Sequence, residues 1–445
     1  MSGSDPTAAA VVAEWAVAAR ERALPADVAH EALRCMLNFV GCAIGGTTHD
    51  VVRAMDRALS PLSGPHAASA IGLAKRVDPL LAAMLNGASA SAHSFDDTHA
   101  EAVVHPGAPV CAAALAAAQL ESSAGGAMLV ATALGVEICC RLSKAISVPP
   151  AEGDIAWYQT GICGGIGAAV AAGTLLRLDA TQMRNAIGIA VATASGSRIF
   201  QGSMPMLMLA GHAAKCGLRA ALLAREGFDS PANAIDGAHG FAAVFSHSAH
   251  LPALTSELGE RHEILANRYK AYPCGVVLHP VVDACLALHA TPDCSPGSIA
   301  RVDVRLHPVA LQLTDRPRPQ TRTEAQVSLQ HWTAVALVTG RAGLPEGDLP
   351  LVGDPMVATL RECVAALPDA ALPRDAVEVT VHRRDGRLIA SGRYEGSPRM
   401  SDAALEAKFR AQVQPLFGPG ETSRLLAALS ALPLAADLAP LATLL

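Results

Sequence analysis

Apolar residues recur every three or four positions through most of the first 265 residues, and this spacing predicts a series of helices. The series begins with residues 8–23, and Pro25 opens the second helix. Its later members are predicted at residues 110–120, 126–146, 161–176, 181–193 and 210–225. Gly227, directly after Ala-Arg-Glu, is typical of a residue that ends a helix.

The pattern changes near Arg268 and changes back after residue 398. Residues 299–307 and 376–382 alternate between apolar and polar positions, as half-buried strands do. Asp385 and Gly386 form a hairpin signal that leads into a third strand at 387–393. The helices predicted within and after this part of the chain are 323–338, 354–367 and 401–445.

These elements predict a mainly α fold with two domains. A large all-helical domain would contain residues 1–267 and, after an interruption, residues 399–445. The interruption, residues 268–398, would form a smaller α+β module. A chain of 445 residues is long enough to build two hydrophobic cores.

Composition favours closely packed helices and excludes nucleic acid as a partner. Hydrophobic residues make up 51% of the chain but aromatic residues only 3%, so Ala, Leu and Val must fill the core. The net charge is −6 and no basic stripe is present. Residues 155–176 carry no charge and are long enough to span a bilayer. Their frequent glycines favour a buried helix instead, so we expect no membrane partner.

The 11 cysteines predict free thiols in a reducing cytoplasm. They include no Cys-x-x-Cys pair and no Cys/His spacing typical of zinc sites. The N-terminus carries Asp5 and lacks the basic start of a signal peptide. The glycines of residues 161–167 follow no predicted strand, which excludes a dinucleotide site. We therefore expect a cytoplasmic protein without a cofactor.

The densest polar group is the sequence HSFDDTH at residues 93–99, followed by His105-Pro106-Gly107. It gathers three imidazoles and two carboxylates within 13 residues. Polar groups are costly to bury unless they are hydrogen-bonded. The cluster therefore indicates helix capping, metal binding or proton transfer, and the sequence alone leaves these three open.

Several separated motifs occur in one order along the chain. They are Asn86-Gly87, residues 95–98, His105-Pro106-Gly107, residues 157–173, residues 210–214, residues 270–274 and His279-Pro280. On these motifs the chain resembles the MmgE/PrpD family, which includes 2-methylcitrate dehydratases, cis-aconitate decarboxylases and iminodisuccinate epimerases. The resemblance implies a helical domain with an α+β lid and an active site in the cleft between them. It also implies a homodimer, a small polycarboxylate substrate and chemistry without a metal or cofactor.

The chain departs from the pattern that the dehydratase and decarboxylase branches resemble at five positions. Ser94 stands for an Asp, Tyr158 for a His, Met206 or its neighbours for a Lys, Gly275 for a His and His331 for a Tyr. Losing these groups dismantles the acid/base set that dehydration or decarboxylation needs. The pattern is therefore most similar to the iminodisuccinate epimerase branch. The alternatives are a tricarboxylate dehydratase or decarboxylase of the 2-methylcitrate or cis-aconitate type, and a catalytically silent member that binds carboxylates.

For an epimerase, the resemblance implies that proton carriers stand on opposite faces of one carbon. Tyr158 would act on one face and His99 or His105 on the other, with Lys270 stabilising the enediolate. The side chains expected to bind the substrate are Arg198, His93, Asp97, Thr98, His279 and His331. For each of these residues the alternative is a purely structural role; Asp97, for example, is equally suited to cap a helix N-terminus.

Overall fold

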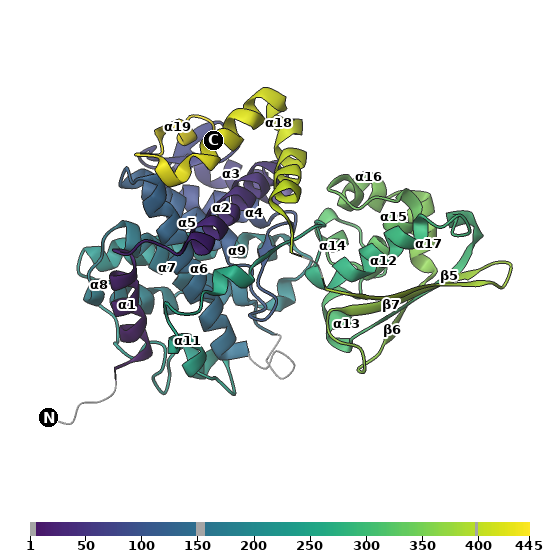
Figure 1. The fold of residues 1–445 in the computed structure, drawn as a ribbon, viewed down its shortest axis with the longest axis horizontal. Helices are drawn as coiled ribbons and strands as arrows, with labels where there is room; N and C mark the ends of the chain where they lie inside the picture. Colours follow the sequence, from purple (N-terminus) through teal and green to yellow (C-terminus); the bar gives the residue numbers. More distant parts are fainter. Residues whose placement is uncertain (1–5, 148–155, 397–398) are drawn as a thin grey trace.

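The computed structural model describes residues 6–147, 156–396 and 399–445. Asp5, Ile155 and the predicted boundary at residue 398 lie outside these ranges. Helix makes up 59% of the structure and strand 10%, which confirms the predicted mainly α fold with a smaller α+β domain. Figure 1 shows the helical part as one body, from which the α+β lid projects.

The predicted helices of the first 265 residues are all present. The helices are α1 (Ala8–Ala19), α2 (Ala26–Gly46), α3 (Asp50–Leu59), α4 (Pro79–Ser91), α5 (Gly107–Leu120), α6 (Gly125–Ser147), α7 (Gln159–Leu175), α8 (Ala180–Val191), α9 (Met204–Arg225), α10 (Phe241–Phe245) and α11 (Pro252–Thr255). Two short strand pairs accompany them, β1 (Ala68–Ala70) with β2 (Lys75–Val77) and β3 (Asp97–Thr98) with β4 (Arg268–Tyr269). Gly227 ends α9 with a φ of +89°, as the sequence predicted.

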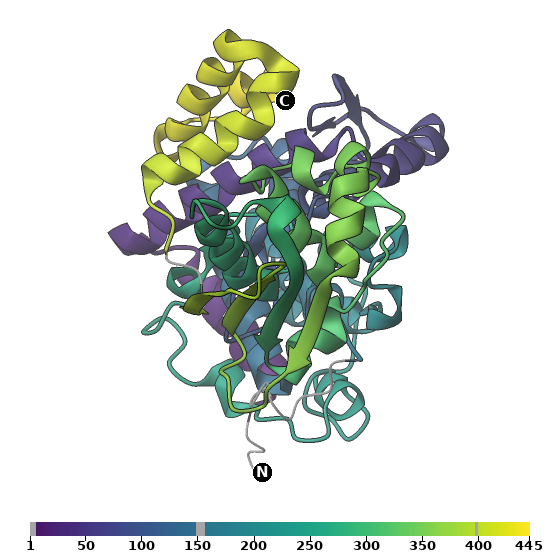
Figure 2. The ribbon, with the colours of Figure 1, turned by 90° about the vertical axis from the view of Figure 1, so that its right-hand side faces the viewer.

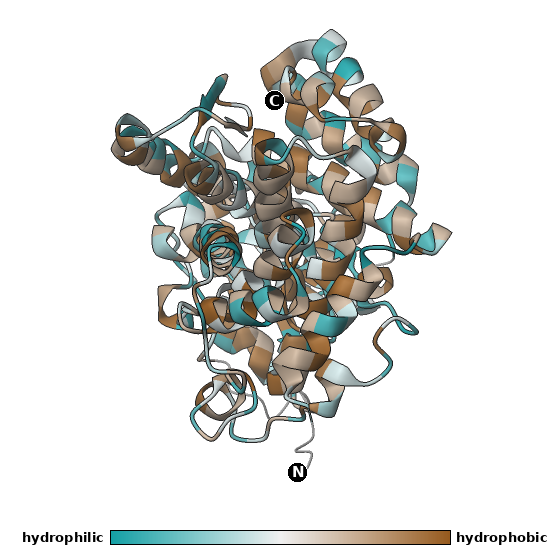
Figure 3. Cartoon of the chain, turned by 90° about the vertical axis from the view of Figure 1, so that its left-hand side faces the viewer, coloured by the Kyte–Doolittle hydropathy of each residue, from teal (hydrophilic) through white to brown (hydrophobic). Residues whose placement is uncertain are grey.

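Small residues let the central helices approach one another closely. A Cβ added to Gly211 of α9 would lie 2.0 Å from the carbonyl oxygen of Met84 in α4. A Cβ on Gly167 of α7 would lie 2.6 Å from the carbonyl oxygen of Gly135 in α6. Figure 3 shows apolar segments concentrated in these middle helices. The Ala- and Gly-rich composition is therefore what permits the close packing.

Two helices, α6 and α9, are long and apolar enough to cross a membrane by length and composition alone. Within the structure, 83% and 67% of their apolar windows are buried against other elements. Every residue of α7 is buried as well, in agreement with the buried helix expected for the uncharged segment. All three helices belong to the core of the helical domain.

The C-terminal segment returns to the helical domain. Its helices are α18 (Asp402–Ser430) and α19 (Ala439–Ala442). Figure 2 shows them (yellow) beside the first helices (purple), and α18 packs against α2. Phe409 fits over Gly41, where an added Cβ would lie 2.8 Å from the phenyl ring. Buried apolar residues between Phe409 and Leu445 thus share one core with residues 8–264.

The lid has a separate core made by a sheet and the helices on one face. Its elements are α12 (His279–His289), β5 (Ile299–Leu306), α13 (Pro308–Thr314), α14 (Arg322–Ala325), α15 (Leu329–Thr339), α16 (Leu349–Val352), α17 (Pro355–Glu362), β6 (Val364–Pro368), β7 (Ala376–Arg383) and β8 (Leu388–Glu395). The strand order is β6-β5-β7-β8, with β5 and β6 parallel and the other pairs antiparallel. Helices α12 and α15 pack together, α12 against β7 and β8 and α15 against β6.

Two lid predictions were wrong. The helix predicted at 354–367 ends at Glu362, because residues 364–368 pair with β5 as strand β6. This long-range pairing overrides the helical preference of Ala and Leu. The helix predicted at 323–338 is interrupted, because the Ser328 hydroxyl accepts a hydrogen bond from the His331 backbone N–H and starts α15 afresh. The interruption places Gln326 at the lid surface that faces the helical domain.

Candidate active site in the cleft between the domains

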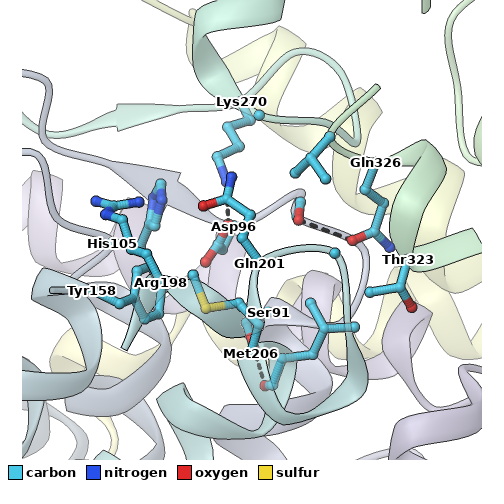
Figure 4. Close-up of a pocket in the computed structure, with 15 residues that line it drawn as sticks. Ser91, Asp96, His105, Tyr158, Arg198, Gln201, Met206, Lys270, Thr323 and Gln326 are labelled. Atoms are coloured by element: carbon cyan, nitrogen blue, oxygen red, sulfur yellow. Dashed lines mark hydrogen bonds and ion pairs between the residues drawn. The ribbon is translucent and has the colours of Figure 1, made fainter. Parts of the chain in front are cut away.

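A cleft lies where the lid meets the helical domain and holds about 580 Å³ of space free of protein atoms, part of it open to solvent. Figure 4 shows side chains from both domains around it. Its lining includes Ser91, Ser94, Asp96, His105, Tyr158, Arg198, Gln201, Met206, Lys270, Gly275, Thr323 and Gln326. The cleft thus brings together four side chains predicted from the sequence: His105, Tyr158, Arg198 and Lys270.

Lys270 and Asp96 form a buried ion pair at the cleft wall. Antiparallel pairing of β3 with β4 brings the two segments together, and Lys270 Nζ lies 2.6 Å from Asp96 Oδ1. Burial alone would raise the pKa of Asp96, but Lys270 and His105 bring it below its ordinary value. Asp96 is therefore ionised and holds Lys270 in place at the cleft.

His105 is held as a neutral imidazole. Its Nδ1 lies 2.7 Å from the carbonyl oxygen of Asp97, an atom that only accepts, so Nδ1 carries the proton and donates it. Burial, followed by the charge of Lys270, lowers the pKa of His105 to about 4. At neutral pH the Nε2 lone pair is therefore available to take a proton, which suits a general base.

Arg198 and Tyr158 complete the polar wall. Arg198 donates from Nε to the Trp157 carbonyl oxygen at 2.9 Å and from Nη2 to Gln159 Oε1 at 2.8 Å. Its Nη1 makes no hydrogen bond to the part of the chain that the structure describes, which leaves it for a ligand. The guanidinium carbon lies 5.6 Å from the Tyr158 ring centroid. Burial, and then the charge of Asp96, raises the pKa of Tyr158 above its ordinary value, so the phenol stays protonated and suits an acid.

Gln326 of the lid is hydrogen-bonded to the segment of the helical domain that leads into the HSFDDTH sequence. Its Nε2 donates to the Ala92 carbonyl oxygen at 2.8 Å, and its Oε1 accepts from the Ser94 hydroxyl at 3.0 Å. Ser94 adopts a φ of +49°, a conformation that is uncommon outside glycine. The Ser94 hydroxyl therefore joins the two domains at the position where the sequence departs from the family pattern.

The C-terminal helix supplies a second buried lysine close to the cleft. Lys408 Nζ donates to the Phe95 carbonyl oxygen at 2.6 Å and to Asn38 Oδ1 at 2.8 Å. Burial lowers the pKa of Lys408 to about 8. Its buried neighbours on α18 are Leu405, Phe409, Gln412 and Val413. A lysine within this mostly apolar stripe was the available sequence signal, and neither Lys408 nor Gln326 was among the predicted site residues.

Asp97 and Thr98 are buried and do not line the cleft. Both Asp97 oxygens accept from the Gly107 N–H, at 3.1 and 2.9 Å, and Oδ2 accepts from Asn267 Nδ2 at 2.6 Å. A Cβ at Gly107 would lie 2.6 Å from that oxygen, so only glycine permits this contact. Asp97 therefore holds the first N–H of α5, and the contact of Asp97 and Thr98 with the substrate stays a prediction.

His99 lies in a buried hydrogen-bonded network and is not among the residues that line the cleft. Its imidazole is fully buried outside the cleft, with Nε2 3.0 Å from Glu263 Oε2 and Nδ1 accepting from the Ala102 N–H at 3.1 Å. Lys144 reaches the same carboxylate, with Nζ 3.1 Å from Glu263 Oε1. Because both ring nitrogens are engaged by the protein, we assign His99 to this buried network.

The other three predicted histidines are not among the residues that line the cleft; His93 is partly buried, and His279 and His331 are fully buried. His93 Nε2 is 3.2 Å from the Gly45 carbonyl oxygen, and His331 Nε2 is 2.8 Å from that of Glu346. His279 is fully buried. Burial lowers the pKa of His93, His279 and His331 to about 3, 3 and 4. All three are therefore neutral at pH 7, and their contact with the substrate stays a prediction.

Within residues 6–147, 156–396 and 399–445, no three His, Cys, Asp or Glu side chains lie together as a metal-binding group. Lys270 and Asp96 pair with each other, and the Asp97 carboxylate is directed toward α5. The polar groups that face the cleft are therefore suited to an anionic organic ligand.

Comparison with known proteins adds a family to this geometry. The MmgE/PrpD N-terminal domain model matches residues 10–253, and the MmgE/PrpD C-terminal domain model matches residues 272–433. The chain is 29% identical to the cis-aconitate decarboxylase of Mus musculus over 360 residues, which are 76% of this chain and 72% of that protein. The corresponding enzyme of Homo sapiens is 27% identical over 403 residues, 85% of this chain and 82% of that protein. The 2-methylcitrate dehydratase of Cupriavidus necator is 26% identical over 182 residues, 36% of this chain and 37% of that protein.

Proposed function

The chain belongs to the MmgE/PrpD family, and from that premise we propose that it is a lyase that removes carbon dioxide or water from a small polycarboxylate. Its named relatives are decarboxylases and a dehydratase. They support a lyase better than the iminodisuccinate epimerase that the sequence analysis favoured. The observation that carries the proposal is a neutral His105 between Lys270 and Arg198 in the cleft.

The charges of the cleft define the class of substrate. Arg198 and Lys270 are cations in a largely desolvated site, with Asp96 as the one carboxylate among the described lining residues. In a site of low dielectric constant, an unbalanced cation attracts a carboxylate strongly. Ser91, Gln201 and Thr323 add neutral hydrogen-bonding groups. A compact ligand with two or three carboxylates complements this arrangement.

The proposed chemistry is proton transfer at a carbon next to a carboxylate. For dehydration, His105 Nε2 removes the proton, Lys270 and Arg198 stabilise the negative charge of the enediolate, and the phenol of Tyr158 protonates the departing hydroxide. For decarboxylation, the same cations stabilise the carbanion left by carbon dioxide, and Tyr158 protonates it. Neither route requires a redox step, so we propose that the enzyme works without a cofactor, in the cytoplasm that its free thiols favour.

One observation keeps epimerisation as the second candidate. Ser94, Tyr158, Met206 and Gly275, four of the five departures from the dehydratase and decarboxylase pattern, line the cleft. The departures thus change the reacting site itself and not a remote surface. A base and an acid remain in His105 and Tyr158, whose ring centroids are 6.2 Å apart. That pair is the minimum needed to remove and return a proton at one carbon.

Proton NMR in deuterium oxide distinguishes the candidates. Purified protein would be incubated with cis-aconitate, 2-methylcitrate, citrate and iminodisuccinate in separate samples. The proposal expects net loss of one tricarboxylate with release of carbon dioxide or water. Deuterium entry at an α-carbon without net loss would replace the lyase by the epimerase. If none of the acids changes, the proposed function is wrong for this class of substrate.

A further inference from the structure

Helix α9 carries a cysteine and a histidine in contact, away from the cleft. Cys216 Sγ lies 3.4 Å from His212 Nε2, because residues four positions apart share one face of a helix. Arg219, one turn further along, donates from Nη2 to the same sulfur at 3.8 Å. An imidazole and a guanidinium thus converge on one sulfur atom.

Among the described residues, no carboxylate forms an ion pair with His212. Lys215 and Arg219 both lower the pKa of His212, yet its pKa is raised overall because the hydrogen bond to Cys216 dominates. For Cys216, burial raises the pKa, but the hydrogen bond and charge of His212, with contributions from Thr193 and Arg219, bring it below the ordinary value. Thiolate and imidazolium therefore stabilise each other as a pair.

Cys216 differs in this respect from the other cysteines for which a pKa shift is resolved. Burial, or for Cys35 the contact with Cys111 together with burial, raises the thiol pKa of all of them. Those thiols are inert core groups. Cys216 is mostly covered, at 4% exposure, but its partners His212 and Arg219 are only half-buried. The side chains that contact the sulfur therefore extend toward solvent, while the sulfur itself is covered.

We propose that Cys216, with His212 and Arg219, is a nucleophilic thiolate site that small electrophiles and peroxides modify selectively. With hydrogen peroxide as oxidant, the sulfur forms a bond to one oxygen while the O–O bond breaks. The sulfur is oxidised to a sulfenic acid and the peroxide is reduced. The hydroxide that leaves takes the proton of the His212 imidazolium and departs as water. The site is independent of the cleft and of the function proposed for it.

The test is alkylation of the full chain by iodoacetamide at pH 6.5 and pH 9.5, with the rate at Cys216 followed by peptide mass spectrometry. An ordinary thiol with a pKa of about 8.5 is only about 1% thiolate at pH 6.5. We expect the ratio of the Cys216 rate at pH 6.5 to that at pH 9.5 to be at least about tenfold higher in the wild type than in His212→Gln. Because both rates are measured at the same sulfur, burial slows them equally and drops out of the ratio.

Lys215→Gln is the matched control, because it removes a charge on α9 that does not contact the sulfur; since Lys215 lowers the pKa of His212, this variant should keep or raise the wild-type ratio and should not lower it. Circular dichroism would verify that His212→Gln is folded. The pH profile of wild-type Cys216, compared with that of the partly exposed Cys363, tests the site without any variant. A ratio unchanged by His212→Gln, a Cys216 profile no lower in pH than that of Cys363, or no labelling at pH 9.5 would each overturn the proposal. Trapping the sulfenic acid with dimedone after peroxide treatment should label Cys216 in the wild type and not in His212→Gln.

Discussion

Asp96→Asn should destabilise the protein strongly although it keeps the shape of the side chain. The Asp96 and Lys270 side chains are 5% and 3% exposed, and their charged atoms are 2.6 Å apart. Removing one partner of a buried pair leaves the other charge uncompensated, which costs about 3–5 kcal/mol. Asparagine opens no cavity, so the loss of stability would report the charge alone.

The dependence on pH has a definite sign. The pKa of Asp96 is lowered in the folded protein, so its contribution to stability is present above its unfolded pKa of about 4 and is lost as the pH falls through the folded value. The difference in stability between wild type and Asp96→Asn should therefore be constant above about pH 5 and should shrink below about pH 4.

Urea unfolding of wild type, Asp96→Asn, Lys270→Met and the double variant forms a double-mutant cycle. Each single variant should lose about 3–5 kcal/mol, and the double variant should lose clearly less than the sum of the two. Asp229→Asn on the exposed surface is the control and should stay within about 0.5 kcal/mol of wild type. A loss below about 1 kcal/mol for Asp96→Asn, or strict additivity in the cycle, would refute the reasoning.

Further predictions concern the cleft residues, Lys408 and the expected homodimer without a cofactor. Tyr158→Phe should lower turnover at least about 100-fold with little change in KM. Near-normal turnover would show that Tyr158 lines the cleft without transferring a proton. The acid limb of kcat/KM should fall near pH 4, where the His105 base becomes protonated, and a limb at about pH 6.5 would contradict that assignment. Wild type should gain stability relative to Lys408→Met between about pH 8 and pH 10.5, because the folded pKa is the lower one; a flat difference in urea melts would count against it. Light scattering should give the mass of two chains, and the mass of one chain would exclude the expected homodimer. Turnover should survive a chelator, and activity that is lost and then restored by one divalent ion would exclude the expected work without a cofactor.

The sequence predicted the fold wherever local pattern decides the structure. Helical spacing placed α5 to α8 within three residues of their observed bounds and gave the end of α9 but not its start at Met204. Strand β6 was missed because residues 364–368 have helical composition and become a strand only by pairing with β5. Nothing local to that segment records the identity of its partner.

The site was predictable to the extent that its chemistry lies in motifs. His105, Tyr158 and Lys270 belong to such motifs and line the cleft. Gln326 and Lys408 were missed because they contact residues more than 230 positions away in the sequence. Residues 93–99 also contain His99 and Asp97, which bind other parts of the protein. Their partners in the fold, and not their spacing in the sequence, show this role.

The central claim is that His105 in this cleft is the base that removes the proton in the dehydration route, and loss of water from a tricarboxylate with His105→Gln tests it most directly. Wild type and the surface control His247→Gln should release water from the same acid at equal rates. His105→Gln, verified as folded by circular dichroism, should be slower by about 10²–10⁴-fold with KM nearly unchanged. Turnover by His105→Gln at the wild-type rate would contradict the account, because the proton would then be moved by another group.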